Sequence, residues 1–184
     1  FRRAIFLKGM KFMFRKATKK DIDRISEIYN EIHDSEEAGL VTIGWIRKIY
    51  PTRKTAEIAI AAGDMFVEEI DGTIVAAARI NKEQVPEYAD ASWTADAPDD
   101  EVMVLHALVV SPKTKGKGYG TAFVDFYEKH ALENGCPYLR MDTNARNTAA
   151  RSLYKKLGYT EVSIVPCVFN GIDGVQLVCL EKNL

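Results

Sequence analysis

An apolar run from Val102 to Val110 predicts a buried β-strand. Ser111-Pro112 ends the run, and lysines then alternate with glycines between Lys115 and Gly120. A helix is expected directly afterwards, ended by Gly135, because one face is apolar at Phe123, Tyr127 and Ala131. A strand that leads through a glycine-rich loop into a helix N-terminus builds an anion site, since backbone N–H groups and the positive end of the helix dipole converge there.

Paired β-rich runs predict two hairpins elsewhere in the chain. The first joins Met65–Ile70 to Thr73–Ile80 through a two-residue Asp-Gly turn. The second joins Thr160–Phe169 to Val175–Glu181, with its turn expected at Asn170–Gly174.

The residues before the first hairpin predict a strand and two helices. The strand is expected at Phe12–Arg15, and a capping box at Thr18–Asp21 opens the first helix. Its isoleucines at positions 22, 25, 28 and 32 share one face. Residues 42–62 predict further helix, interrupted at Pro51 and ended by Gly63.

Residues 83–101 form a long acidic segment between two predicted strands. It carries seven acids, two prolines and two aromatic residues, Tyr88 and Trp93, but no lysine or arginine. Acids together with aromatic rings suit a cationic ligand, through charge and cation–π contacts. The alternative is a solvated acidic loop pinned by one tryptophan, and the pattern leaves both open.

Composition places the chain among ordinary globular proteins. Hydrophobic residues make up 47% of its 184 positions and charged residues 28%, which suits one domain, expected at residues 12–184. A net charge of −1 argues against a nucleic-acid-binding protein. Three cysteines without CxxC spacing suggest neither a disulfide framework nor a metal site, so the reducing cytoplasm is the expected location. No apolar run is long enough to span a membrane.

The first eleven residues are expected to be an N-terminal extension. Arginines precede a short apolar stretch there, but no small-residue cleavage site follows, which argues against a signal peptide. Met10 and Met13 are alternative start positions.

The glycine-rich loop matches neither common nucleotide motif. A Walker loop needs Gly-Lys followed by Ser or Thr, and a dinucleotide fingerprint needs GxGxxG, whereas the glycines here follow the pattern GxGxG. Lys115-x-x-Gly118-x-Gly120 after a strand resembles the acetyl-CoA pyrophosphate loop of the GNAT N-acetyltransferase superfamily, with lysine in place of the usual Arg or Gln. The next block of that family is also matched, at Asn147, Ala150, Tyr154 and Gly158-Tyr159.

This resemblance implies an α/β (α+β) GNAT fold. Its central sheet is mixed and mostly antiparallel, with about seven strands and helices on both faces. The implied function is acetyl-CoA-dependent N-acetylation of a primary amine by direct attack. The residues that the resemblance assigns to the cofactor are Leu108, Val109, Val110, Lys115, Gly116, Lys117, Gly118, Tyr119, Gly120, Thr121, Asn147, Ala150 and Tyr154.

Acetyl transfer also needs an oxyanion donor, an acid and a base. The resemblance implies the Val109 N–H as the donor facing the thioester oxygen and Tyr154 as the acid that protonates the departing thiolate. His106, within a His-Ala-Leu-x-Val context similar to the arylalkylamine N-acetyltransferases, is the first candidate base. Glu101, acting through water, is the second. Both Tyr154 and His106 also fit simple roles as core residues.

The acceptor itself is not fixed by the sequence. Trp45 and Tyr50 are expected in its pocket by resemblance, and Trp93 through the acidic segment; each also fits a plain packing role. A small cationic amine is the first hypothesis. A protein N-terminus or lysine is the second, and a non-catalytic sensor of acyl-CoA is the third. Members of the family are often dimers, so a homodimer is open.

Overall fold

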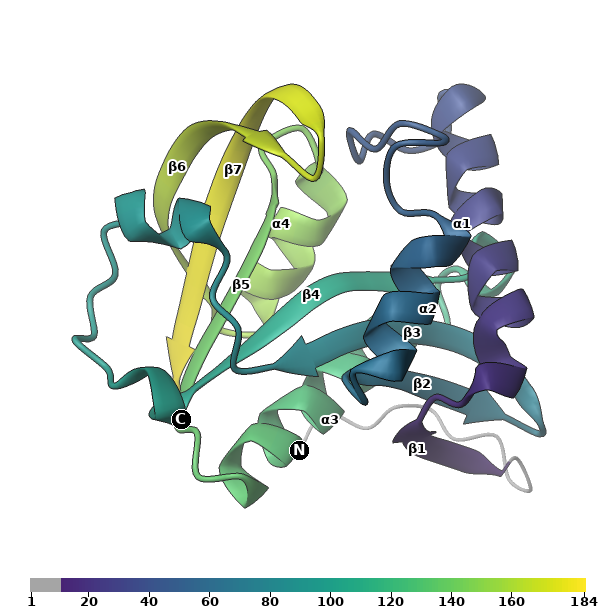
Figure 1. Cartoon of the computed structure of the whole chain (residues 1–184), viewed down its shortest axis with the longest axis horizontal. Helices are drawn as coiled ribbons and strands as arrows, with labels where there is room; N and C mark the ends of the chain where they lie inside the picture. Colours follow the sequence, from purple (N-terminus) through teal and green to yellow (C-terminus); the bar gives the residue numbers. More distant parts are fainter. Residues whose placement is uncertain (1–10) are drawn as a thin grey trace.

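The computed structural model describes residues 11–184 (Figure 1). The N-terminal extension expected at residues 1–11 lies outside them, apart from Lys11. The strands are β1 (Phe12–Lys16), β2 (Met65–Ile70), β3 (Thr73–Asn81), β4 (Val102–Val110), β5 (Tyr138–Asn144), β6 (Thr160–Phe169) and β7 (Ile172–Asn183). The helices are α1 (Ile22–Glu37), α2 (Arg53–Ala61), α3 (Tyr119–Glu133) and α4 (Thr148–Lys156), with short 3₁₀ turns at η1 (Lys19–Asp21), η2 (Pro86–Asp90), η3 (Asp99–Glu101) and η4 (Pro112–Thr114).

Within the described residues, the strands form one seven-stranded sheet in the order β1-β2-β3-β4-β5-β7-β6. Neighbouring strands are antiparallel except β4 and β5, which pair in parallel. The mixed, mostly antiparallel sheet predicted from the sequence is therefore confirmed.

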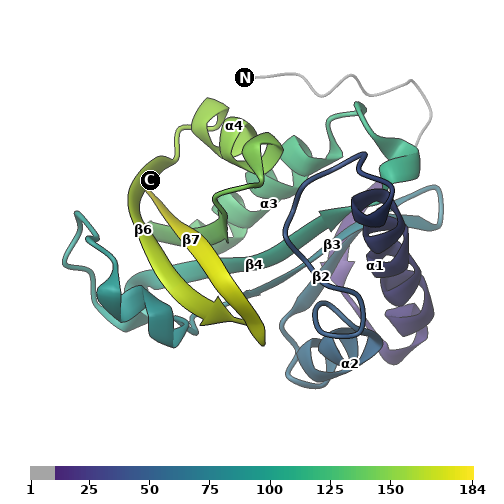
Figure 2. The same cartoon turned by 90° about the horizontal axis from the view of Figure 1, so that it is seen from above.

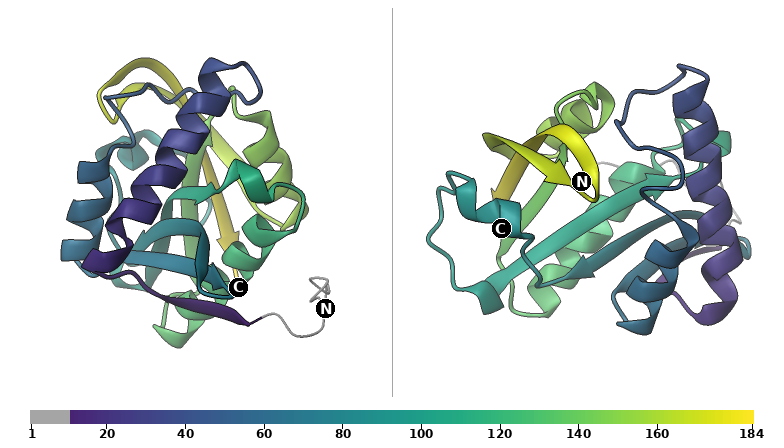
Figure 3. Two further views of the ribbon diagram at one scale, coloured as in Figure 1. Left: turned by 90° about the vertical axis from the view of Figure 1, so that its right-hand side faces the viewer. Right: turned by 45° about the horizontal axis from the view of Figure 1, so that its top comes forward.

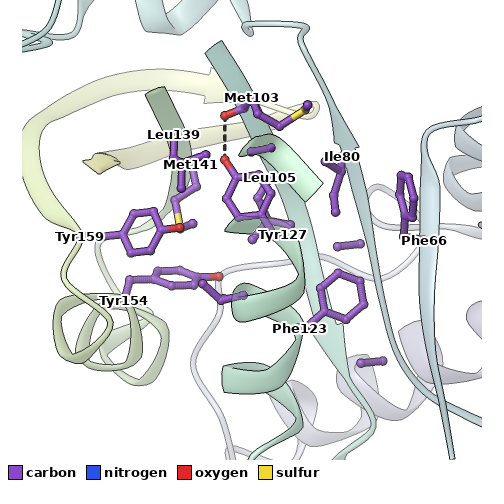
Figure 4. Packing of buried hydrophobic residues seen from close by; sticks show 14 of the residues in the cluster. Phe66, Ile80, Met103, Leu105, Phe123, Tyr127, Leu139, Met141, Tyr154 and Tyr159 are labelled. Carbon is purple, nitrogen blue, oxygen red and sulfur yellow. Dashed lines mark hydrogen bonds between the residues drawn. The ribbon is translucent and has the colours of Figure 1, made fainter. Parts of the chain in front are cut away.

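Different segments cover the two faces of this sheet. Helices α3 and α4 pack on one face, where Phe123 and Tyr127 are fully buried against alternate residues of β4 and β5 (Figure 4). On the other face, α1 and α2 cover β2, β3 and the end of β4. The acidic segment, residues 83–101, covers the β5–β7 part of that same face and, seen from above, lies on the opposite side of the molecule from α1 (Figure 2).

Both predicted hairpins are present, and the second is tighter than expected. Asp71 and Gly72 take φ values of 48° and 80°, as a two-residue turn requires. The second turn is also two residues long, because Asn170 and Gly171 take φ values of 52° and 78°. Strand β7 consequently begins at Ile172 rather than Val175. The Asn-Gly pair is itself a strong hairpin signal and accounts for the tighter turn.

The helix predicted over residues 42–62 was wrong in its first half. Only Arg53–Ala61 is helical, starting from a capping box at Thr52. Residues 41–50 form a loop in which Gly44 and Lys48 take φ values of 88° and 68°, which no right-handed helix contains. The carboxylate of Glu36, in α1, holds this loop by accepting hydrogen bonds from the backbone N–H groups of Ile43 and Gly44. A tertiary contact thus overrides the apolar periodicity of the segment.

Candidate active site

Strand β4 contains a β-bulge that determines which way its side chains point. Its register with β3 gains one residue between His106 and Val109, and Ala107 takes a φ of 49°. One extra residue reverses the alternation of the strand. His106, on the even-numbered side before the bulge, and Val109, on the odd-numbered side after it, therefore point to the same face.

Strand β4 also leaves its other neighbour near the bulge. It pairs with β5 only from Val102 to Leu105, so residues beyond Leu105 expose one backbone edge. The Ser111 N–H donates to Val75 O at 2.8 Å, and antiparallel pairs alternate between bonded and non-bonded. Val109 is therefore in a bonded pair with Ala77, and its N–H points at β3. The neighbouring Val110 N–H, rather than that of Val109, points to the open edge.

The glycine-rich loop joins this open edge to α3. Gly118 precedes the helix with a φ of 83°, and no side chain caps the helix N-terminus. The first N–H groups of α3 are therefore free to bind a ligand. A side chain at Gly116 or Gly118 would meet no atom within 4 Å, so open space lies against this backbone.

Helix α4 contributes the second predicted motif. Asn147 caps it by accepting a hydrogen bond from the Ala150 N–H at 3.1 Å. Tyr154 is 7% exposed and packs near Tyr159 and Tyr127 (Figure 4), with burial and the nearby Asp142 raising its pKa. The phenol is consequently protonated at neutral pH, as a proton donor must be.

One cavity of about 510 Å³ connects these features. Most of the residues assigned to the cofactor line it: Leu108, Val109, Val110, Lys115, Gly116, Gly118, Tyr119, Gly120, Asn147, Ala150 and Tyr154. Lys117 and Thr121 belong to the same loop and helix but do not line it. His106, Trp45 and Tyr50 do line it, and the two aromatic rings meet edge to face with centroids 5.8 Å apart.

The loop 41–50 forms a roof over this cavity. A Cβ atom added to Gly44 would lie 2.4 Å from Asn144 Nδ2, so the loop touches the end of β5. A Cβ atom added to Gly171 would lie 3.4 Å from Ile49, so the β6–β7 turn touches the loop as well. Figure 3 shows α1 and the β6–β7 hairpin rising on either side of β4, with this loop between them.

His106 is held in one tautomer. The Asn81 side-chain amide donates through Nδ2 to Asp64 at 2.8 Å, so its oxygen faces His106 Nε2, 2.9 Å away. Nε2 therefore carries the hydrogen and Nδ1 keeps the lone pair. Burial, helped by the positive charge of Arg79, lowers the pKa of His106 to about 4. His106 is neutral at pH 7 and is a weaker base than an exposed histidine.

The acidic segment does not bring its acids to the cavity. None of its seven acids, Glu101 included, is among the described residues that line the cavity, and Glu101 is exposed on η3. Trp93 does not line the cavity either. Its ring stacks on the guanidinium of Arg140 at 4.3 Å, and its N–H donates to Tyr88 O. The cation that Trp93 contacts is thus Arg140 of the protein itself. This placement fits the second of the two alternatives for residues 83–101, a solvated acidic loop pinned by one tryptophan.

Sequence reasoning missed Asp142, an acid that lies in the cavity. Leu139 and Met141 on β5 face the α3 side, so strand alternation alone would place Arg140 and Asp142 on a solvent-exposed face. Residues 83–101 cover that face instead. Tyr88 of this segment donates its hydroxyl to Asp142 Oδ2 at 2.8 Å, and burial raises the pKa of Asp142 to about 6.

Comparison with known proteins identifies the class. The Acetyltransferase (GNAT) family profile matches residues 22–159. An uncharacterised N-acetyltransferase of Methanocaldococcus jannaschii is 25% identical over 155 residues, which are 84% of this chain and 63% of that relative. The chain thus spans less than two thirds of the length of that relative.

Solved structures share the fold, and two of them illustrate it. A GNAT-family acetyltransferase from Streptococcus agalactiae superposes with a TM-score of 0.79 at 23% identity, covering 97% of this chain and 98% of that one. A Salmonella typhimurium acetyltransferase, solved with its cofactor acetyl-CoA, gives a TM-score of 0.66 at 21% identity, covering 94% of each chain.

The chain belongs to the acetyltransferase (GNAT) family, and the enzyme class expected from the two motifs is confirmed. Residues 11–184 contain no group of three His, Cys, Asp or Glu side chains arranged to hold a metal ion. The same residues include no helix with the length and apolar character needed to cross a membrane.

Proposed function

We propose that this protein transfers an acetyl group from acetyl-CoA to a small cationic primary amine by direct attack. The observation that carries the proposal is the single cavity lined by both the glycine-rich loop and the roofed pocket around Trp45, Tyr50 and Asp142. A donor and an acceptor bound in one cavity are held next to each other in the geometry that the reaction needs.

The glycine-rich loop suits the pyrophosphate of acetyl-CoA. Free N–H groups at the start of α3, the positive end of its dipole and Lys115 favour an anion. Open space at Gly116 and Gly118 lets phosphate oxygens reach the backbone. The Salmonella relative, which binds acetyl-CoA, has the same fold and supports this assignment.

The open edge of β4 suits the pantetheine arm. Beyond Leu105 this edge has no partner strand among the described residues, so its backbone groups are available to a ligand. When bound, acetyl-CoA supplies a thioester carbonyl that an amine can attack. The Val110 N–H points to the same edge and is the backbone donor that we assign to the carbonyl oxygen.

Protons are handled by three side chains that line the cavity. Tyr154, protonated at neutral pH, is assigned to donate to the departing thiolate. Asp142, with a pKa of about 6, and neutral His106, with a pKa of about 4, are the candidate acceptors of the proton from the amine. Asp142 is the better match to neutral pH, because a general base works best when its pKa lies near the working pH. Glu101 is not part of this assignment.

The roof favours a small acceptor over a polypeptide. Gly44 lies against Asn144, and Ile49 lies near the β6–β7 turn, so loop 41–50 crosses the space that a peptide would need. A protein substrate would require this loop to move. The small amine therefore remains the first hypothesis.

Thiol release tests the proposal. Acetyl-CoA is mixed with the protein and a panel of primary amines, free thiol is followed with a chromogenic reagent, and mass spectrometry measures acetyl gain on the amine. Amine-dependent thiol release with matching acetylated product is expected. Acetyl-CoA binding without release for any amine would favour the sensor, and release only with peptides would favour a protein acceptor.

A further inference from the structure

The charges that line the cavity are few. Among the described residues that line it, Asp142 is the one acid, and Arg79 and Lys115 are the cations. Lys115 belongs to the glycine-rich loop. The other end of the cavity, which includes Tyr50, Asp142 and Phe169 and is called the acceptor end below, therefore contains one carboxylate and one guanidinium. Arg79 is itself paired with the carboxylates of Asp64 and Glu83. Asp142 is therefore the charge at this end that has no ionic partner among the described residues, and it is the one that attracts a cation.

Asp142 is arranged to receive a ligand. Its Oδ2 accepts a hydrogen bond from the Tyr88 hydroxyl at 2.8 Å. Its Oδ1 accepts none from the described residues, yet it is not among the sealed, unpartnered side-chain atoms. The free oxygen is therefore accessible, and Asp142 lines the cavity. A half-buried carboxylate with one oxygen left free on the wall of a cavity can accept a hydrogen bond from a ligand donor.

The walls around Asp142 are apolar and aromatic. Tyr88 belongs to a hydrophobic cluster that also includes Tyr50, Val85, Phe169, Ile172, Val175 and Leu177, and each of these six lines the cavity. Such walls stabilise an apolar ligand body, and among the described residues that line the cavity they offer a second ammonium group no second carboxylate.

We propose that Asp142 binds the ammonium group of the acetyl acceptor and that this acceptor is a singly charged primary amine on an apolar body. That the bound amine is the acetyl acceptor rests on the proposed function. That Asp142 binds an ammonium group rests on the geometry of the cavity alone. It ranks a singly charged amine above polyamines and amino sugars, because a second ammonium group would find no second carboxylate among the described residues that line the cavity.

Three probes of matched length separate the contributions. Hexylamine carries one charge on an apolar chain, 1-hexanol replaces that charge with a hydroxyl, and hexane-1,6-diamine adds a second charge at the far end. Each is titrated by calorimetry into the protein saturated with CoA, which permits binding without turnover. Hexylamine is expected to bind about tenfold more tightly than either other probe, the order of a charge-assisted hydrogen bond.

Asp142→Asn is the decisive variant, because it keeps the shape and the acceptor for Tyr88 but removes the charge. It should weaken hexylamine binding about tenfold or more and leave 1-hexanol unchanged. Chemical denaturation checks the fold, and the variant should be at least as stable as the unmodified protein at pH 7.5, since burial disfavours the ionised carboxylate. Asp99→Asn, on the exposed η3 turn, is the matched control and should change none of these quantities.

The outcomes divide the two proposals. Unchanged hexylamine binding in folded Asp142→Asn, or diamine binding as tight as hexylamine binding, overturns the Asp142 inference even if amines are acetylated. Asp142-dependent hexylamine binding without thiol release from acetyl-CoA upholds the binding site and overturns the proposed transfer. Acetylation with a KM that rises only in Asp142→Asn supports both.

Discussion

The two ends of the cavity are built in different ways. The cofactor end consists largely of backbone, contributed by the open edge of β4, the glycine-rich loop and the first turn of α3, which are consecutive in the sequence. The acceptor end consists of side chains from separate segments, including Tyr50, Asp142 and Phe169. A site built from backbone can be recognised in the sequence, because it requires glycines at fixed spacing. A site built from side chains of separate segments leaves no such motif, because its residues come together only in the folded structure.

The largest effect is expected at Tyr154, which lines the cavity from α4 and is assigned to the chemical step. Tyr154→Phe keeps the ring that packs with Tyr127 and Tyr159 and removes the hydroxyl. We expect kcat to fall about 100-fold with unchanged acetyl-CoA affinity, the usual worth of a general acid. Steady-state kinetics and calorimetry measure the two quantities.

Tyr159→Phe is the matched control for this change. Tyr159 lies on the same hydrophobic cluster, but its hydroxyl is sealed without a hydrogen-bond partner. Its removal should leave kcat unchanged and should not lower stability, since an unsatisfied buried group is lost. Equal losses in the two variants would assign the Tyr154 effect to packing.

A smaller effect, confined to the cofactor end, is expected from Gly118→Glu. The side chain brings a negative charge to the loop proposed to bind pyrophosphate, and acetyl-CoA affinity should fall about tenfold or more, which corresponds to about 1.4 kcal/mol. Gly118→Asn separates charge from strain, because asparagine tolerates the φ of 83° found there. If calorimetry finds the same acetyl-CoA affinity for both variants, the charge has no effect and the pyrophosphate does not bind at this loop.

The sequence predicted closely the strand and the helix that flank the glycine-rich loop. Strand β4 has the predicted limits, and the buried face of α3 includes all three predicted apolar residues. The bulge at Ala107 escaped prediction, because alanine in the left-handed region is set by the tertiary pairing of β4 with β3 rather than by its own preference. Beyond that bulge the Val110 N–H, and not the Val109 N–H, points to the open edge, which is why we assign the backbone donor to Val110.

The acceptor end could be predicted only in part. Trp45 and Tyr50 line the cavity, but Trp93 and Glu101 do not, although the composition of residues 83–101 pointed there. The composition of a segment shows that acids are present, but it does not show in which direction their side chains will point once the segment is folded. Arg140 and Asp142 on β5 decide that, by holding Trp93 and Tyr88. The sequence carried no local signal for this contact, because charged residues that alternate with apolar ones along a strand are ordinary.

The pH dependence distinguishes the two candidate bases. The pKa of Asp142 is raised to about 6, so Asp142 is ionised above this pH and neutral below it, and kcat/KM should fall as pH drops through about 6. A limb set by His106 would lie near its pKa of about 4. The groups that act on Asp142 or respond to its charge are Tyr50, Tyr88, Glu87, Tyr154, Cys167 and Cys179.

Tyr88→Phe sharpens this assignment, because the Tyr88 hydroxyl lowers the pKa of Asp142 by bonding its charged form. Without it, the acid limb should move to higher pH by roughly half a unit to one unit, a threefold to tenfold loss of kcat/KM below pH 6. His106→Gln should leave the limb in place. A limb that disappears in His106→Gln and persists in Asp142→Asn would assign the base to the histidine.

The smallest effect is expected from the roof, at Gly44. Gly44→Ala puts a methyl group 2.4 Å from Asn144 Nδ2, and because that atom ends a flexible side chain, Asn144 can rotate away. Asn144 and Gly44 both line the cavity, so the adjustment changes the acceptor end and not the glycine-rich loop. We expect KM for the amine to rise about threefold to fivefold, roughly 1 kcal/mol, with acetyl-CoA affinity unchanged.

Gly39→Ala controls for backbone strain in this experiment. Gly39 has a φ of 71°, close to the 88° of Gly44, but an added Cβ there meets nothing within 4 Å. Both variants therefore carry the cost of alanine in the left-handed region, and only Gly44→Ala changes the contact with β5. A KM that rises equally in the two would show that loop 41–50 acts through stability alone. A rise confined to Gly44→Ala would mean that the roof shapes the acceptor end, by a contact between segments 100 positions apart that no local pattern encodes.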